Sequence, residues 1–300
     1  MKYLIHFTIL LSSFTLLAEP KVVVTIKPLY SIAAQLTKGV STPDLLMKEK
    51  VSPHHFHLLP SHIKTLKTAD IVLWVGPEME TELSKTIGEL DETKIITAMT
   101  LENVKLLETR GSSCGCQHHE HHHDDDHDHE KTFDPHIWTN PDNTLAIAGA
   151  LKNHLIQLDE KNKAIYEANY TDFSAKIFGL KNKIKDMLKK SQTKFFIFHD
   201  ALQYLEDYAG LKSEIVQGNH DTGFSLKEII NLKKMLEKSP QKCILTDEEL
   251  PASKITEMLG NIPDLKIKEI SPEGIYTDVG EDTYFEMMDD LIVKINACIN

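Results

Sequence analysis

The chain has 300 residues, 41% of them apolar and 26% charged, which is the composition of an ordinary globular protein long enough for two domains. The formal net charge is −12 with 16 histidines counted as neutral. Such an acidic chain excludes nucleic acid and anionic lipid as expected partners and is compatible with attracting cations.

Residues 1–18 have the pattern of a secretory signal peptide. Lys2 supplies the positive start, residues 4–17 are mainly apolar, and Ala18 is a small residue suited to the cleavage position. The apolar part is too short and too interrupted for a membrane-spanning helix, and no other stretch could span a membrane. We therefore expect a soluble, exported protein. Its four cysteines suit an oxidising compartment.

Strands and helices alternate after the signal sequence. The strands are β-branched or apolar runs, and proline, serine or glycine marks several helix ends. Strands are expected at residues 21–26, 70–75 and 94–96, with helices between Pro28 and Gly39, at residues 62–69 and at residues 78–87. This alternation predicts a parallel sheet covered on both faces.

A histidine-rich segment, residues 112–130, interrupts the pattern. It has seven histidines within the twelve residues 118–129 and no apolar side chain there, so we expect a solvated, mobile loop that binds metal weakly through imidazole. Cys114 and Cys116 at its start are soft-metal ligands or a strained pair. Residues 119–123 match the zinc-protease pattern H-E-x-x-H, but the segment lacks the apolar periodicity of the helix that this chemistry requires.

The second half of the chain repeats the alternation after a long helix. Apolar residues recur at spacings of four and three over residues 161–190, which predicts a helix about 45 Å long that joins two lobes rigidly. Strands are expected at residues 194–198, 213–216, 243–246 and 265–270, and the last helix at residues 283–298. The predicted fold is α/β, with two lobes that each contain a small parallel sheet flanked by helices. Residues 19–160 form the first lobe, residues 161–190 the linking helix, and residues 191–300 the second lobe.

Four candidate metal ligands lie near strand ends or in loops between the predicted elements. They are His54, His136, His199 and Asp247. Ligands of open α/β sheets bind beyond the carboxyl ends of strands, so these side chains are expected to meet in a cleft between the lobes. Three neutral imidazoles and one carboxylate fill the tetrahedral coordination that zinc prefers.

Two positions of this site stay open on the sequence alone. His55 and His57 compete with His54 for the first-lobe position, because all three lie in one loop. Asp247 is followed by two glutamates, so Asp247, Glu248 or a water molecule is the fourth ligand.

Several short motifs place the chain in a known family. They are Ser52-Pro53-His54 followed by Pro60-Ser61, the run ADIVLWVGPEME at residues 69–80, Asp134-Pro135-His136-Ile137-Trp138, Phe198-His199-Asp200-Ala201, and the late cysteines Cys243 and Cys298. Together with the histidine-rich segment they resemble the zinc-specific periplasmic solute-binding proteins of bacterial ABC transporters, the metal receptors of cluster A-I. The resemblance covers essentially the whole mature chain.

The resemblance implies a ligand set and a covalent cross-link. It implies His54, His136 and His199 as zinc ligands, completed by a carboxylate or water, and a disulfide in the second lobe. Cys243 opens a predicted strand and Cys298 ends the last helix, and a bond between them would add about 3–4 kcal/mol of stability.

The predicted function is a monomeric, non-catalytic receptor that captures zinc in the periplasm and delivers it to an ABC permease of the inner membrane. Imidazole ligands favour zinc, whereas manganese prefers more oxygen, which makes a manganese receptor the weaker interpretation. A zinc buffer or chaperone without a transporter is an alternative. A zinc hydrolase is another, but it needs an open coordination position and a general base.

Overall fold

The computed structural model describes residues 19–48, 50, 52–110, 131–188, 194–216, 224–247 and 249–300. The signal-like residues 1–18, the histidine-rich segment with Cys114 and Cys116, and Glu248 lie outside the described residues. The expectations for these positions therefore stay predictions.

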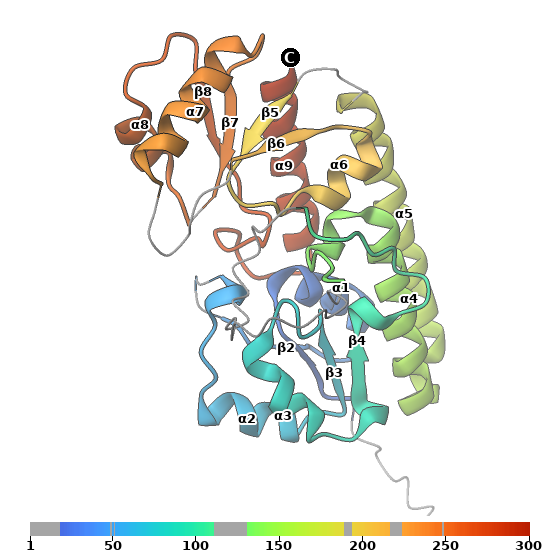
Figure 1. The fold of residues 1–300 in the computed structure, drawn as a ribbon. Helices are drawn as coiled ribbons and strands as arrows, with labels where there is room; N and C mark the ends of the chain where they lie inside the picture. Colours follow the sequence, from blue (N-terminus) through green and yellow to red (C-terminus); the bar gives the residue numbers. More distant parts are fainter. Residues whose placement is uncertain are drawn as a thin grey trace, which may run out of the picture.

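Two separate parallel sheets of four strands each form the framework (Figure 1). Their strand orders are β2-β1-β3-β4 and β6-β5-β7-β8, so both sheets are wound in the same sequence. We call the first sheet with its helices the first lobe and the second sheet with its helices the second lobe. The strands are β1 Val22–Val24, β2 Asp44–Leu45, β3 Ile71–Trp74, β4 Ile95–Thr97, β5 Phe195–Ile197, β6 Ser213–Ile215, β7 Cys243–Thr246 and β8 Lys266–Glu269.

The central strands are buried along their whole length. Every residue of β1, β3, β5 and β7 is buried, because parallel sheets are covered on both faces by the helices of their crossover connections. This explains why these strands are almost entirely apolar in the sequence, with Thr246 at the end of β7 as their one polar residue. The edge strand β8 contains two lysines and no fully buried residue. The expected α/β class with two small parallel sheets is confirmed.

Helices lie around both sheets, and α1 (Lys27–Thr37) and one end of α9 (Thr283–Ile299) lie between them together with loops (Figure 1). Two short 3-10 helices, Pro53–His55 and Ile137–Thr139, lie in loops that prove important for the site. The α-helices are α1 Lys27–Thr37, α2 Pro60–Lys67, α3 Ser84–Gly88, α4 Pro141–Leu158, α5 Lys163–Met187, α6 Gln203–Ala209, α7 Leu226–Lys238, α8 Ala252–Leu259 and α9 Thr283–Ile299. None of these described helices has the length and apolar character needed to cross a bilayer.

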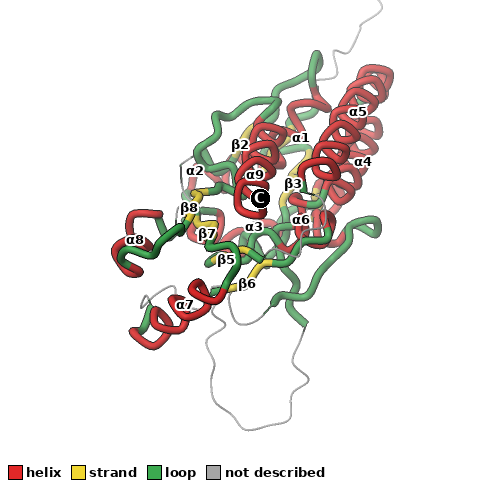
Figure 2. The backbone as a smooth tube through the Cα atoms, turned by 90° about the horizontal axis from the view of Figure 1, so that it is seen from above, coloured by secondary structure: helices red, strands yellow, loops and turns green. Residues whose placement is uncertain are grey.

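The long helix α5 runs beside α4 along one side of the molecule, past both sheets (Figures 1 and 2). It packs against α1 and α4 of the first lobe and against α9 of the second. Its buried face contains Tyr166, Phe173, Ile177, Leu180 and Ile184, which follow the predicted spacing of three and four. The helix is 25 residues long and therefore spans about 38 Å.

A segment of the first lobe, residues 105–110, is hydrogen-bonded to the second lobe around α6. The Leu107 N–H donates to the Tyr204 hydroxyl over 3.0 Å. Arg110 Nε donates to Asp200 Oδ2 over 3.0 Å. The two lobes are thus tied together on this side by direct polar contacts of the backbone and of buried charges.

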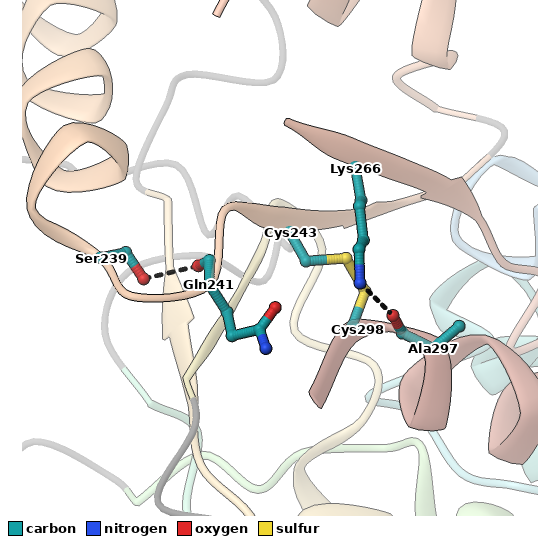
Figure 3. The surroundings of a disulfide bond; sticks show 6 residues. All are labelled: Ser239, Gln241, Cys243, Lys266, Ala297 and Cys298. Carbon is teal, nitrogen blue, oxygen red and sulfur yellow. Dashed lines mark hydrogen bonds between the residues drawn. A yellow bond between two sulfur atoms is a disulfide. The ribbon is translucent and has the colours of Figure 1, made fainter. Parts of the chain in front are cut away.

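A disulfide joins Cys243 of β7 to Cys298 of α9, as the family resemblance implied (Figure 3). Both cysteines are fully buried, and their Cα atoms are 5.4 Å apart. The bond closes a separation of 55 residues. Beside it, Lys266 Nζ of β8 donates to the Ala297 carbonyl over 3.1 Å, so the last helix is fixed to the sheet at two adjacent points.

Candidate metal centre

Three of the predicted site residues, His54, His136 and His199, lie within contact distance of one another. Their ring centroids are 5.4 Å apart for His54 and His136, 5.5 Å for His54 and His199, and 4.9 Å for His136 and His199. The first two belong to the first lobe, whereas His199 follows β5 of the second lobe. The group therefore forms where the lobes meet.

The two first-lobe histidines are held by short local motifs. Ser52 caps the 3-10 helix that contains His54, with its hydroxyl accepting from the His54 N–H over 3.4 Å. Asp134 Oδ1 accepts from the His136 N–H over 2.9 Å and lies 2.7 Å from His136 Nδ1. Trp138 packs edge-on against the His136 ring with centroids 5.4 Å apart. Because Nδ1 of His136 is engaged by Asp134, its Nε2 is the atom directed to the group.

His199 is held in the same way by Asp247. The two residues follow β5 and β7, which are neighbouring parallel strands, so their carboxyl ends lie side by side. Asp247 Oδ2 lies 2.7 Å from His199 Nδ1. A metal-ligating histidine normally has its other ring nitrogen paired with a carboxylate or carbonyl in this manner, which fixes its tautomer and its orientation.

The carboxylate grouped with the three histidines is Glu273. One donor atom from each of His54, His136, His199 and Glu273 lies within 4.8 Å of every other. The sequence analysis placed Asp247 in this role; in the structure Asp247 contacts the outer nitrogen of His199 instead. Glu273 was not predicted from the sequence. It nevertheless lies only three positions after the predicted strand at residues 265–270, near a strand end, where ligands of parallel sheets are expected.

Two distances within the group are close to those of a tetrahedral metal site, and all four donor atoms lie within 4.8 Å of one another. Zinc bound at 2.0–2.1 Å separates neighbouring ligand atoms by about 3.4 Å in a regular tetrahedron. His54 Nε2 lies 3.4 Å from His136 Nε2 and 3.6 Å from Glu273 Oε1. These donors therefore need little movement to coordinate one small cation.

The electrostatics of the site depend on burial and on the two aspartates. Burial and the nearby charge of His199 lower the pKa of His136 well below its usual value, so His136 is neutral at physiological pH. Burial also lowers the pKa of His199 and is the largest single effect, but the hydrogen bond to Asp247 and the negative charges of Asp247, Glu249 and Glu273 together outweigh it and raise the pKa to about 10. A bound metal ion must therefore replace a proton on His199.

The other loop histidines lie outside the group. The side chain of His55 is 69% exposed, and its Nε2 lies 3.7 Å from Glu249 Oε1. His57 is also exposed. Of the three histidines that the sequence left open for the first-lobe position, His54 is thus the one that lies with His136 and His199.

Comparison with known proteins identifies the family to which the chain belongs. A family model described as "ZnuA: Zinc-uptake complex component A periplasmic" matches residues 22–298. The chain is 34% identical over 218 residues to the high-affinity zinc uptake system protein ZnuA of Yersinia pestis, covering 67% of this chain and 69% of that protein. It is 28% identical over 303 residues to the protein of the same name from Haemophilus ducreyi, covering 97% of each.

A solved structure shows the same fold. The Zn(II)-bound ZnuA-like domain of Streptococcus pneumoniae AdcA superposes with a TM-score of 0.72 at 19% identity, covering 94% of this chain and 99% of that domain. The motifs, the two-lobed fold and the matched range agree. The chain belongs to the ZnuA family of periplasmic zinc-uptake components.

Proposed function

We propose that this protein is a zinc receptor that captures zinc in the periplasm and delivers it to an ABC permease for import. The observation that carries the proposal is the preassembled group of three imidazoles and one carboxylate at the junction of the lobes. The relatives in Yersinia pestis and Haemophilus ducreyi are named for high-affinity zinc uptake, which supports the same cargo.

The proposed ligands are His54, His136, His199 and Glu273. Three nitrogen donors and one oxygen donor suit zinc, whereas manganese prefers sites richer in oxygen. Replacing His199→Glu would exchange one nitrogen for oxygen. We expect this variant to bind zinc more weakly and to shift its relative preference toward manganese, measured by competition between the two ions.

The donor set supports binding rather than catalysis. A hydrolytic zinc site keeps one coordination position open for water, whereas four protein ligands complete the tetrahedron. We therefore propose that the protein is not an enzyme. A hydrolysis screen of the zinc-loaded protein tests this, and turnover that disappears in Glu273→Ala would refute it.

The proposed periplasmic location and transporter partner have their own support. The signal-like pattern of residues 1–18 and the buried Cys243–Cys298 disulfide both suit an exported protein in an oxidising compartment. A zinc buffer without a transporter is the alternative. Restored growth under zinc limitation, in a strain that lacks its own receptor but keeps the permease, would favour the import function; growth restored equally without the permease would favour the buffer.

The central experiment is zinc binding by the mature chain in competition with a chelator of known affinity. We expect one tight site in the wild type and a strong loss of affinity in His199→Ala. His154→Ala is the matched control, because His154 contacts the Thr93 carbonyl over 3.1 Å and takes no part in the group. Equal affinities of wild type and His199→Ala would refute the assignment of the site.

A further inference from the structure

The segment that carries Glu273 belongs to the second lobe by sequence but is held by the first. It follows β8 and leads into α9. On one side of Glu273, Trp138 Nε1 donates to the Pro272 carbonyl over 2.9 Å. On the other side, Lys27 Nζ donates to the carbonyls of Ile275 and Thr277 over 2.6 and 2.9 Å. Both donors are first-lobe residues, and the carbonyls that accept from them lie on either side of Glu273 in the sequence.

The same segment is fixed to α1 farther along. Ser31 Oγ and Gln35 Nε2 both donate to the Glu281 carbonyl, over 2.6 and 2.9 Å. Lys27, Ser31 and Gln35 are spaced by four residues and lie on one face of α1. Residues 275–282 are therefore attached along their length to a first-lobe helix.

Lys27 occupies a position that is unfavourable for a lysine. It is only 7% exposed, so its ammonium group has lost most of its hydration. It is also the first residue of α1, where the helix dipole places partial positive charge. The ammonium group donates to two backbone carbonyls of the segment next to Glu273, so this segment takes up part of its hydrogen-bonding capacity.

We propose that Lys27 is a positioning residue that sets the Glu273 carboxylate in the zinc site. The inference rests on the proposed function, with Glu273 as a zinc ligand. The proposed zinc ligands are then divided unequally between the two lobes. His54, His136 and Glu273 move with the first lobe, and His199 alone moves with the second. Loss of Lys27 therefore acts on zinc through Glu273, without any contact between Lys27 and the metal.

The test is zinc affinity of Lys27→Met by chelator competition, in the wild-type and Glu273→Gln backgrounds. Loss of a group that positions a ligand typically weakens metal binding about 10-fold or more. We expect about that loss in the wild-type background and a change of less than about twofold in Glu273→Gln, where the positioned ligand is already gone. Simple electrostatics predicts the opposite sign, because removing a positive charge favours binding of a dication.

Two further measurements separate positioning from general damage to the fold. Lys38→Met is the matched control, because Lys38 ends the same helix and pairs with Glu281 over 2.9 Å at the exposed surface; we expect wild-type zinc affinity. Cobalt-loaded Lys27→Met should show the altered visible absorption of cobalt-loaded Glu273→Gln. If Lys27→Met does not fold, Lys27→Gln replaces it in every arm.

Wild-type affinity in the Lys27 variant, or an equal loss in both backgrounds, would overturn the inference while leaving the zinc receptor intact. A wild-type chain that has no tight zinc site would instead refute the proposed function, and the inference with it.

Discussion

Glu80 is a buried carboxyl group whose ionisation should oppose folding. It is 1% exposed and lies at the end of β3, where the N–H groups of Val75 and Gly76 donate to it over 3.0 to 3.2 Å and the Thr25 hydroxyl contacts Oε1. Burial raises its pKa from 4.5 to about 7, although these hydrogen bonds act in the opposite direction.

The sign and size of the effect follow from this shift. Because the folded state holds the proton more tightly than the unfolded state, the contribution of Glu80 to stability is complete below pH 4.5 and is lost as pH rises to about 7. A shift of this size corresponds to about 3 kcal/mol. Glu80→Gln mimics the protonated acid in shape and in hydrogen bonding, so this part of the pH dependence should be absent from the variant.

The assay is urea unfolding of metal-free wild type and Glu80→Gln from pH 4 to pH 8. We expect the difference in unfolding free energy, wild type minus variant, to fall by about 3 kcal/mol across this range. Glu82→Gln, an exposed neighbour in the same connection, is the control for replacing a carboxylate by an amide. A constant difference between wild type and Glu80→Gln across this range would mean that Glu80 ionises as it does in water, and the reasoning from burial would be wrong.

Three further predictions concern the cross-link, the histidine-rich segment and the support of the site. Replacing Cys243 and Cys298 together by alanine should lower the free energy of unfolding by about 4 kcal/mol, worked from the separation of 55 residues and measured by urea unfolding; an unchanged midpoint would contradict it. Deleting residues 112–130 should remove weak zinc equivalents and keep one tight site in calorimetric titration, since no ligand of the described group comes from this range; loss of the tight site would show that the segment supplies a ligand. Asp247→Asn should weaken zinc binding about tenfold, because the charged partner of His199 Nδ1 is lost; unchanged affinity would show that the pair does not orient the ligand.

The sequence predicted the parts of the fold that are encoded locally. The buried strands β1, β3, β5 and β7 were found because they are almost entirely apolar, and α5 because its apolar residues repeat with helical spacing. The two-residue strand β2 was missed, since Asp44–Leu45 has no periodicity and pairs only because β1 lies beside it.

The site was predicted in part for the same physical reason. His54, His136 and His199 stand in short motifs at the ends of elements, so their meeting could be inferred from the rules of parallel sheets. Glu273 was missed because Pro272-Glu273-Gly274 reads as an ordinary surface turn. Its place depends on contacts with residues more than two hundred positions earlier, such as Lys27. Asp247 was predicted as a ligand, whereas in the structure its carboxylate contacts Nδ1 of His199, a pairing across two strands that the sequence does not reveal.

The attachment of residues 275–282 to α1 also determines the order in which the molecule can be completed. Lys27 and Ile275 are 248 positions apart, so α1 receives its final partners only after nearly the whole chain has been made. Contacts of such long range form late and slow the search for the native state. Zinc, whose proposed ligands extend from His54 to Glu273, can therefore be held tightly only by a finished chain, and a truncated polypeptide leaves the metal in solution.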